Sequence, residues 1–173
     1  MPHARTAPAH DRMLTNLFVV EAVPAWMTNR LKRLARSPKR YVIDAGLVSA
    51  ALRVDAAGVM RDGNLLGRVL DSFVMARVRG EISVSASGLR PYHLRQQQGR
   101  HEVDVVLEAA NGRVIGVEVK AEAAPTLRSA RHLSWLRDEL GDRFIAGVVL
   151  HTGPRPFVLG DRLSALPISA LWA

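Results

Sequence analysis

The chain has 173 residues, 48% of them hydrophobic, a formal net charge of +8 at pH 7 and no cysteine. A chain of this length and composition can bury one substantial core together with a small appendage. The lack of cysteine excludes disulfides and thiolate-bound zinc. No apolar run approaches the 18 residues of a membrane-spanning helix, and no signal-peptide core precedes the first elements. These features predict a cytoplasmic protein.

The positive charge favours a polyanionic partner, nucleic acid above all. An arginine- and alanine-rich genome would give the same excess without a binding purpose. Among the 24 basic residues only Lys32, Lys39 and Lys120 are lysine. Where the chain uses lysine, the choice therefore indicates a chemical role.

The N-terminal third contains short elements and one strongly basic segment. Residues 1–12 have two prolines and no periodicity, which predicts a disordered lead; a short β-rich run, 17–20, follows. Residues 28–40 carry six basic side chains and no acid. This segment is either a phosphate-contacting arm or a solvated linker. The predicted nucleic-acid contacts are Arg30, Lys32, Arg33 and Arg36.

Beyond this segment the apolar spacing alternates between strand and helix patterns. A strand is expected over 41–44, a short helix or turn over 46–54, and a long helix over 64–79 that ends at Gly80. Strands are expected over 81–87 and 91–95. A second helix, 126–140, is capped by Thr126 and ended by Gly141, and strands follow over 144–151 and 157–159. This order predicts a mixed sheet flanked by helices.

The central stretch, HEVDVVLEAANGRVIGVEVK (101–120), predicts a hairpin around Asn111-Gly112. Glu118 and Lys120 are two apart and share one face of their strand. A two-residue loop would set Asp104 opposite Val119, on the other face. A three-residue loop over 110–112, with a left-handed glycine, sets Asp104 opposite Glu118 and clusters the charges; a single bulge would do the same.

Charges within valine-rich strands are costly to bury unless they are paired or functional. Clustered carboxylates such as Asp104 and Glu118 are the hard oxygen ligands that Mg²⁺ prefers, and Lys120 would supply a point charge for phosphate or for metal-bound hydroxide. A Glu-Lys pair on a half-exposed sheet would show the same pattern without a metal. His93 and His101 could also ligate a metal, although lone histidines near loops are more often surface residues.

The Asp…Glu-x-Lys pattern across a hairpin resembles the core of the PD-(D/E)xK nuclease superfamily. The surrounding sequence resembles one branch of it, the C-terminal domain of a family of bacterial and archaeal AAA+ ATPases. The matching phrases cover roughly residues 14–173 in family order: SPKRYVIDAGLVSAAL, GNLLGRVLDSFV, HEVDVVLE, GVEVKA, HLSWLRDELGDRFIAGVVLHTG and LPISALW. The chain contains no Walker A match, G-x4-G-K-[ST], so it is not expected to act as an ATPase by that route.

The resemblance implies a restriction-endonuclease-like α/β fold over 41–173, preceded by a winged-helix remnant and basic linker over 13–40. It implies a catalytic set of Asp104, Glu118 and Lys120, with Asp104 and Glu118 holding Mg²⁺ or Mn²⁺. Asp71 stands where the family commonly has a glutamate; the alternative is a surface aspartate paired with Arg68. Two functions remain open: a divergent metal-dependent nuclease acting on DNA, or a non-catalytic module that binds DNA or a protein partner such as an ATPase.

Overall fold

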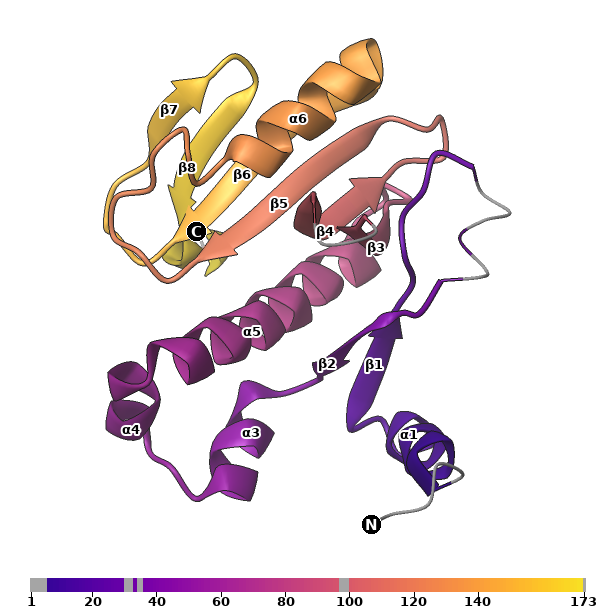
Figure 1. The fold of residues 1–173 in the computed structure, drawn as a ribbon, viewed down its shortest axis with the longest axis vertical. Helices are drawn as coiled ribbons and strands as arrows, with labels where there is room; N and C mark the ends of the chain where they lie inside the picture. The colour runs from indigo at the N-terminus through magenta and orange to yellow at the C-terminus, as the bar shows by residue number, and fades with distance from the viewer. Residues whose placement is uncertain (1–5, 30–32, 34–35, 97–99, 173) are drawn as a thin grey trace.

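The computed structural model describes residues 6–29, 33, 36–96 and 100–172 (Figure 1). In chain order the helices and strands are α1 Thr6–Asn16, β1 Val20–Val23, β2 Lys39–Val42, α3 Ala45–Leu52, α4 Ala56–Arg61, α5 Gly63–Val84, β3 Arg90–Arg95, β4 Glu102–Glu108, β5 Val114–Lys120, α6 Arg131–Leu140, β6 Phe144–His151, β7 Phe157–Gly160 and β8 Leu163–Pro167. Short 3₁₀ turns cover Gly141–Arg143 and Ile168–Trp172.

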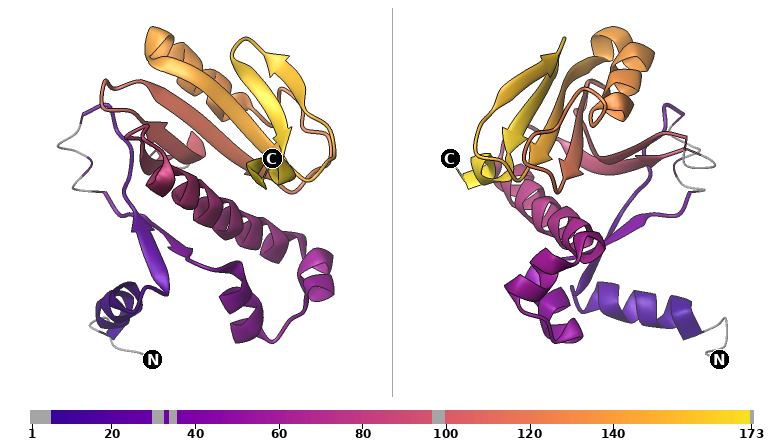
Figure 2. Two further views of the ribbon diagram at one scale, coloured as in Figure 1. Left: turned by 180° about the vertical axis from the view of Figure 1, so that it is seen from behind. Right: turned by 60° about the vertical axis from the view of Figure 1, so that its left-hand side comes forward.

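A six-stranded mixed sheet in the order β3-β4-β5-β6-β8-β7 forms the centre of the fold. The pairs β3–β4 and β4–β5 are antiparallel, and the pairs β5–β6 and β6–β8 are parallel. The edge strand β7 pairs antiparallel with β8. Helix α6 connects the parallel strands β5 and β6 and covers one face, while α5 crosses the other face (Figures 1 and 2). The predicted mixed α/β architecture is confirmed.

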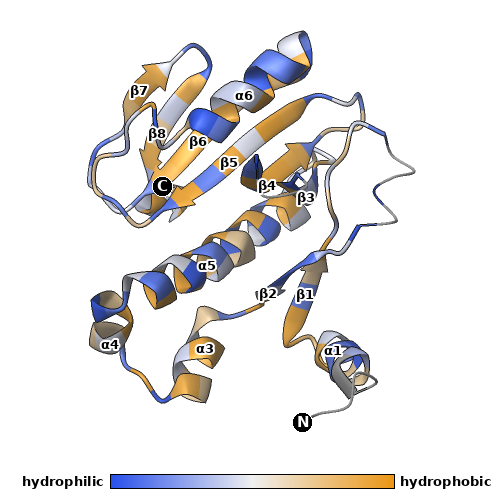
Figure 3. Cartoon of the chain, in the orientation of Figure 1, coloured by the Kyte–Doolittle hydropathy of each residue, from blue (hydrophilic) through white to orange (hydrophobic). Residues whose placement is uncertain are grey.

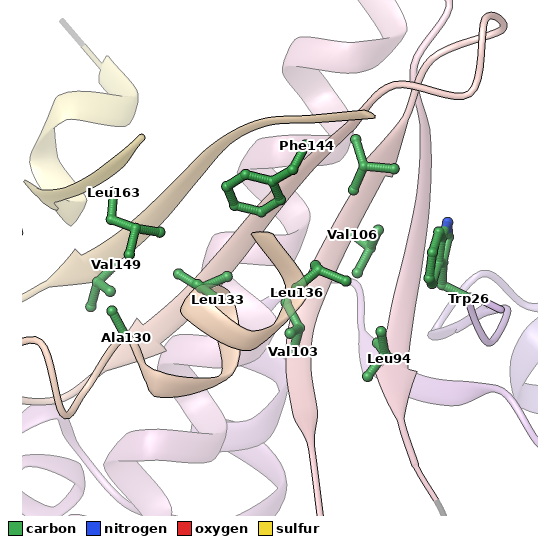
Figure 4. Packing of buried hydrophobic residues seen from close by; sticks show 11 residues of the cluster. Trp26, Leu94, Val103, Val106, Ala130, Leu133, Leu136, Phe144, Val149 and Leu163 are labelled. Carbon is green, nitrogen blue, oxygen red and sulfur yellow. The ribbon is translucent and has the colours of Figure 1, made fainter. Parts of the chain in front are cut away.

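Each face of the sheet has its own apolar core. On the α6 face, Leu133 and Leu136 are fully buried against Val106, Val149 and neighbouring side chains (Figure 4). On the α5 face, the core joins side chains of α5 to the central strands and to the N-terminal strands: Val74, Met75, Val78, Val105, Val117, Val119, Leu150, Val23 and Tyr41. The central strands are accordingly apolar along most of their length, whereas α5 and α6 carry apolar and polar sides (Figure 3). No helix in the described part of the chain is long and apolar enough to cross a membrane.

Residues 6–12 belong to helix α1, which packs against β1, so the predicted disordered lead is wrong for these residues. Residues 1–5 of that prediction lie outside the described residues. Helix α1 begins at Thr6, and Phe18, in the left-handed region at φ 55°, ends it. The predicted strand over 17–20 therefore starts only at Val20. An ion pair between Arg40 and Asp11 ties α1 to β2. Because β1 and β2 form a two-stranded sheet, the predicted boundary at residue 40 falls inside a strand.

Two helix boundaries also differ from the prediction. Helix α5 continues through Gly80 to Val84, because Ile82 extends the spacing of Val74 and Val78 and packs on the same core. The alternation over 81–87 is thus the end of a helix and not a strand. Helix α6 begins at Arg131, and Thr126 does not cap it; the Thr126 backbone N–H donates to Ser129 Oγ in the preceding turn. Gly141 ends α6 as predicted.

The central hairpin has the three-residue loop. The Ala109 N–H donates to the Arg113 carbonyl and the Gly112 N–H donates to the Ala109 carbonyl, with Gly112 at φ 80°. The resulting register pairs Val105 with Val117, and its continuation places Asp104 opposite Glu118. The predicted three-residue loop is confirmed.

Gly147 tests the close packing of α6 on the sheet. A Cβ at this position would lie 2.6 Å from Leu163 Cδ2, 3.0 Å from Phe144 Cζ and 3.2 Å from Leu133 Cβ of α6. We expect Gly147→Ala to lower the free energy of unfolding by about 1–3 kcal/mol in urea titrations, because the overpacked core must shift. The control is Gly80→Ala on the exposed side of α5, where no atom lies within 4 Å of the added Cβ. The free energy of unfolding of this variant should rise by up to about 1 kcal/mol, because alanine has the higher helix propensity. Equal effects of the two variants would contradict this packing.

Candidate functional site

The candidate site lies where β4 and β5 separate, and is called the strand fork below: Asp104, Glu118 and Lys120, with Asp71 and Lys39 against them. The backbone pairing between β4 and β5 runs from Glu108 to Val105. At the next residue of β4 a side chain replaces the backbone as hydrogen-bond acceptor, since the Val119 N–H donates to Asp104 Oδ2 at 3.0 Å. The carboxylate thus lies where the two strands part.

The three predicted catalytic residues do not share one face, which corrects the expected cluster. Along β5, Gly116 faces Leu133 of α6 and Val117 packs in the α5 core, so alternation directs Glu118 and Lys120 to the α6 face. On β4 one extra residue is inserted opposite β3, because Tyr92 pairs with Val106 but Leu94 with Val103.

This β-bulge interrupts the alternation and leaves Asp104 directed toward α5. The two halves of the site therefore meet across the fork instead of lying on one surface. They still act on each other electrostatically, since Asp104 is, after burial, the main cause of the raised pKa of Glu118.

Lys39 of β2 is the functional candidate that the sequence did not single out. Its Nζ lies 3.1 Å from Asp71 Oδ2 and 3.2 Å from Asp104 Oδ1, so one ammonium group links both carboxylates. Burial disfavours this charge, but Asp104, Tyr41 and Asp71 outweigh burial and raise the pKa of Lys39. The rarity of lysine in the chain was the only sequence signal for it.

Asp71 faces the fork and is not paired with Arg68. Lys39 binds its carboxylate, while Arg68 donates to Asn64. Burial and the nearby Asp104 raise the pKa of Asp71. Beside it, the Tyr41 hydroxyl donates to the backbone carbonyl of Asp104 at 3.0 Å, and burial raises the pKa of Tyr41 to about 12. Asp71 and β2 together fix the position of Asp104.

Glu118 is the most buried charged residue of the fork, with 2% of its surface exposed. Lys120 Nζ lies 2.7 Å from Glu118 Oε2, whereas Oε1 is buried and has no hydrogen-bond partner among the described residues. Burial, followed by the charge of Asp104, raises the pKa of Glu118 to about 7 despite the lysine. The carboxylate therefore lacks enough countercharge to be held ionised at lower pH.

The donor set at the fork is small. Within residues 6–29, 33, 36–96 and 100–172, no group of three or more His, Asp or Glu side chains is arranged to hold a metal ion. Asp104 and Glu118 supply oxygen donors of the kind that Mg²⁺ and Mn²⁺ favour, and the unpartnered Oε1 of Glu118 fits such an ion. Water and substrate oxygens would have to complete the shell.

The predicted phosphate-contacting arm is only partly described. Arg30 and Lys32 lie outside the described residues, and Arg36 is exposed. Arg33, by contrast, is buried, because its guanidinium pairs with Glu108 at 2.5 Å and 3.0 Å and stacks near Trp26 and Tyr92. Arg33 therefore anchors the N-terminal segment to β4 and is not available to phosphate.

The two histidines considered as metal ligands have other surroundings. His93 is buried, with Nε2 3.3 Å from the Ser37 carbonyl, and burial lowers its pKa. His101 stacks on Trp135 with ring centroids 4.1 Å apart. Neither joins the carboxylates of the fork in a metal-binding group.

The fold and the fork define a mixed α/β domain with buried acidic and basic side chains at a strand divergence. A family model described as a domain of unknown function (DUF4143) matches residues 66–171, and another described as a domain of unknown function (DUF8612) matches residues 2–58. The first match covers more than half of the chain, which therefore belongs to the DUF4143 family. Lys39 and Tyr41 come from the segment matched by the second model, so both segments build the fork.

Curated relatives include uncharacterized proteins of Mycobacterium bovis and Mycobacterium tuberculosis, each 29% identical over 163 residues. The match covers 94% of this chain but 34% of each relative, so the chain spans about a third of their length. Among solved structures, a complex of EndoMS with double-stranded DNA is similar at a TM-score of 0.31 and 24% identity, covering 46% of this chain and 36% of that one. A similarity this weak carries no functional argument here.

The raised pKa of Glu118 predicts a specific pH dependence of stability in metal-free buffer. The folded chain holds this proton more tightly than the unfolded chain does, so the stabilisation is complete below the ordinary glutamate pKa and is lost as the pH rises through about 7. Between pH 5 and 8 the free energy of unfolding of the wild type should fall by about 2–3 kcal/mol more than that of Glu118→Gln, because the glutamine side chain does not titrate.

Urea unfolding at both pH values measures this difference. Contributions from Asp71 and the histidines are common to both proteins and cancel. Glu81→Gln, at an exposed glutamate paired with Arg77 on α5, should follow the wild type. Parallel pH profiles of wild type and Glu118→Gln would contradict the buried, undercompensated carboxylate.

Proposed function

We propose that the strand fork is the reaction site of a metal-dependent nuclease that hydrolyses phosphodiester bonds of DNA. The observation that carries the proposal is the buried Oε1 of Glu118, which has no hydrogen-bond partner among the described residues while Asp104 lies across the fork. A buried oxygen without a hydrogen-bond partner costs free energy of folding unless a ligand supplies the missing interaction. The resemblance of the Asp…Glu-x-Lys pattern to metal nucleases supports the same conclusion.

Each side chain has a distinct role in this proposal. Asp104 and Glu118 would hold Mg²⁺ or Mn²⁺, which when bound polarises the phosphate and activates water. Lys120, 34% exposed and paired with Glu118, would stabilise the charge that develops on the phosphate and orient the attacking water. Asp71 would act through Lys39 as a positioning residue that keeps Asp104 at the fork.

The net charge of +8 supports DNA as the substrate, because phosphate contacts dominate nucleic-acid affinity. Arg36 remains a proposed contact, and Arg30 and Lys32 are proposed from sequence alone. The chain spans about a third of its curated relatives. We further propose that an ATPase, either a separate protein or part of the same polypeptide, delivers DNA to the fork.

One observation favours a second function, a non-catalytic module that binds DNA or a protein partner. Lys39 already pairs with both Asp71 and Asp104, as in a structural ion-pair network. In this alternative the fork holds the N-terminal segment against the sheet and needs no metal. The two functions differ in what a divalent ion does to the Lys39 contact.

Cleavage assays test the nuclease proposal directly. The wild type should nick or degrade DNA with Mg²⁺ or Mn²⁺ and stop with chelator. Lys120→Ala should reduce the rate by at least about 100-fold, the loss typical of one transition-state donor, while isothermal titration still detects Mn²⁺. Glu118→Gln should lose both cleavage and metal binding, since an amide is a poor ligand for a hard cation. Glu81→Gln serves as the neutral control. Cleavage by Glu118→Gln at the wild-type rate would refute the proposal.

Lys39 separates the two functions without an activity assay. If a divalent ion binds Asp104, it must displace or repel the ammonium group, so Lys39→Ala should bind Mn²⁺ at least about tenfold more tightly. Arg40→Ala, the next residue on β2 with its exposed side chain paired to Asp11, should leave the Mn²⁺ affinity unchanged. A folded Lys39→Ala variant that binds no Mn²⁺ would favour the non-catalytic module.

A further inference from the structure

A cavity of about 420 Å³ lies between the connection from β1 to β2 and helix α6, with the end of β3 as a further wall. The residues that line it include Trp26, Arg36, Arg95, Arg100, Trp135 and Glu139. The volume is in the range of sites that hold a small organic ligand. Two indole rings and three guanidinium groups line it, against the single carboxylate of Glu139.

The positions of these residues make the cavity amphipathic. Trp26 is 95% buried, with Arg33 over its ring, and Trp135 packs partly on the α6 core. Arg36, Arg95 and Arg100 are exposed at the rim. Among the described residues, Arg95 alone of these three forms an ion pair, with Glu102 at 3.7 Å. Aromatic surface below cationic side chains is the combination by which proteins bind an unstacked base and its phosphates.

Residues next to the cavity interact electrostatically with two lysines of the fork. A second cavity of about 310 Å³ shares Arg36 and Arg95 with it and continues to Ser37 and His93. Lys39 follows two residues after Ser37, and its charge acts on His93. On the other side, His101 stacks on Trp135 and contacts His132 edge to face, and His132 experiences the charge of Lys120. Neighbours of the cavity therefore lie within electrostatic reach of both Lys39 and Lys120.

We propose that this cavity, called the Trp/Arg pocket, binds an unpaired nucleotide of a single-stranded DNA segment. The inference rests on the proposed nuclease function for its biological use, but the binding itself needs neither metal nor catalysis. A duplex keeps its bases stacked inside the helix, so the indoles would have no base to contact. The pocket therefore assigns to the fork a substrate with a single-stranded end, gap or flap.

Tryptophan fluorescence in the presence of EDTA tests the pocket. In a Trp172→Phe background the remaining emission comes from Trp26 and Trp135, both of which line the cavity. An eight-nucleotide oligothymidylate should quench this emission saturably, whereas a blunt duplex of the same length should bind at least tenfold more weakly and quench little.

Charge variants then locate the binding. Arg95→Ala with Arg100→Ala should weaken oligothymidylate binding at least tenfold and reduce the slope of log affinity against log salt by about 1.4, the value for two single-strand phosphate contacts. The matched control is Arg61→Ala with Arg155→Ala, which removes two exposed arginines outside the pocket. Glu139→Gln should tighten binding several-fold, a gain that misfolding cannot produce.

Binding of the Arg95/Arg100 variant equal to that of the Arg61/Arg155 control, or equal quenching by duplex, would overturn the pocket proposal. These readouts are independent of cleavage, so failure of the nuclease proposal is recognised separately. Saturable, pocket-dependent quenching by a protein that neither cleaves DNA nor binds Mn²⁺ would support the pocket and reject only the nuclease function.

Discussion

The carboxylate of Asp104 is the contact on which the rest of the structure depends. One of its oxygens accepts the Val119 N–H, which replaces the backbone pair at the point where β4 and β5 separate. The other binds Lys39, which also binds Asp71. One side chain therefore joins β4, β5, β2 and α5. A buried carboxylate needs such partners, because an uncompensated charge in the interior costs several kcal/mol.

The same requirement explains how the N-terminal segment docks. It brings a cation to each of two carboxylates of β4, Lys39 to the half-buried Asp104 and Arg33 to the buried Glu108. Backbone contacts reinforce this arrangement, since the Trp26 N–H donates to the His93 carbonyl and the His93 N–H to the Pro24 carbonyl. The segment matched by the second family model is thus part of the fork. Glu118 lies apart from this N-terminal docking: among the described residues Lys120 is its only ion-pair partner, and its pKa is raised.

Local patterns in the sequence predicted the elements whose burial repeats regularly. The helix over α5, the strand β6 and the three-residue hairpin loop follow from apolar spacing and from the left-handed Gly112. These patterns could not show that β4 contains a bulge, since that depends on its pairing with β3, and the bulge is what separates Asp104 from the face of Glu118. The roles of Lys39 and Arg33 were equally hidden, because both contacts join residues more than 60 positions apart. In sequence, Arg33 is indistinguishable from the exposed Arg36; only its carboxylate partner identifies it as an anchor.

The central claim is that the strand fork binds a divalent cation between Asp104 and Glu118. Crystals grown with Mn²⁺ and measured at its absorption edge test this claim most directly. The account predicts one anomalous peak at the fork, within Mn–oxygen bonding distance of both carboxylates, with the Lys39 ammonium displaced from Asp104. An intact Lys39–Asp104 contact with no anomalous peak at the fork, at Mn²⁺ concentrations that saturate binding in solution, would contradict it.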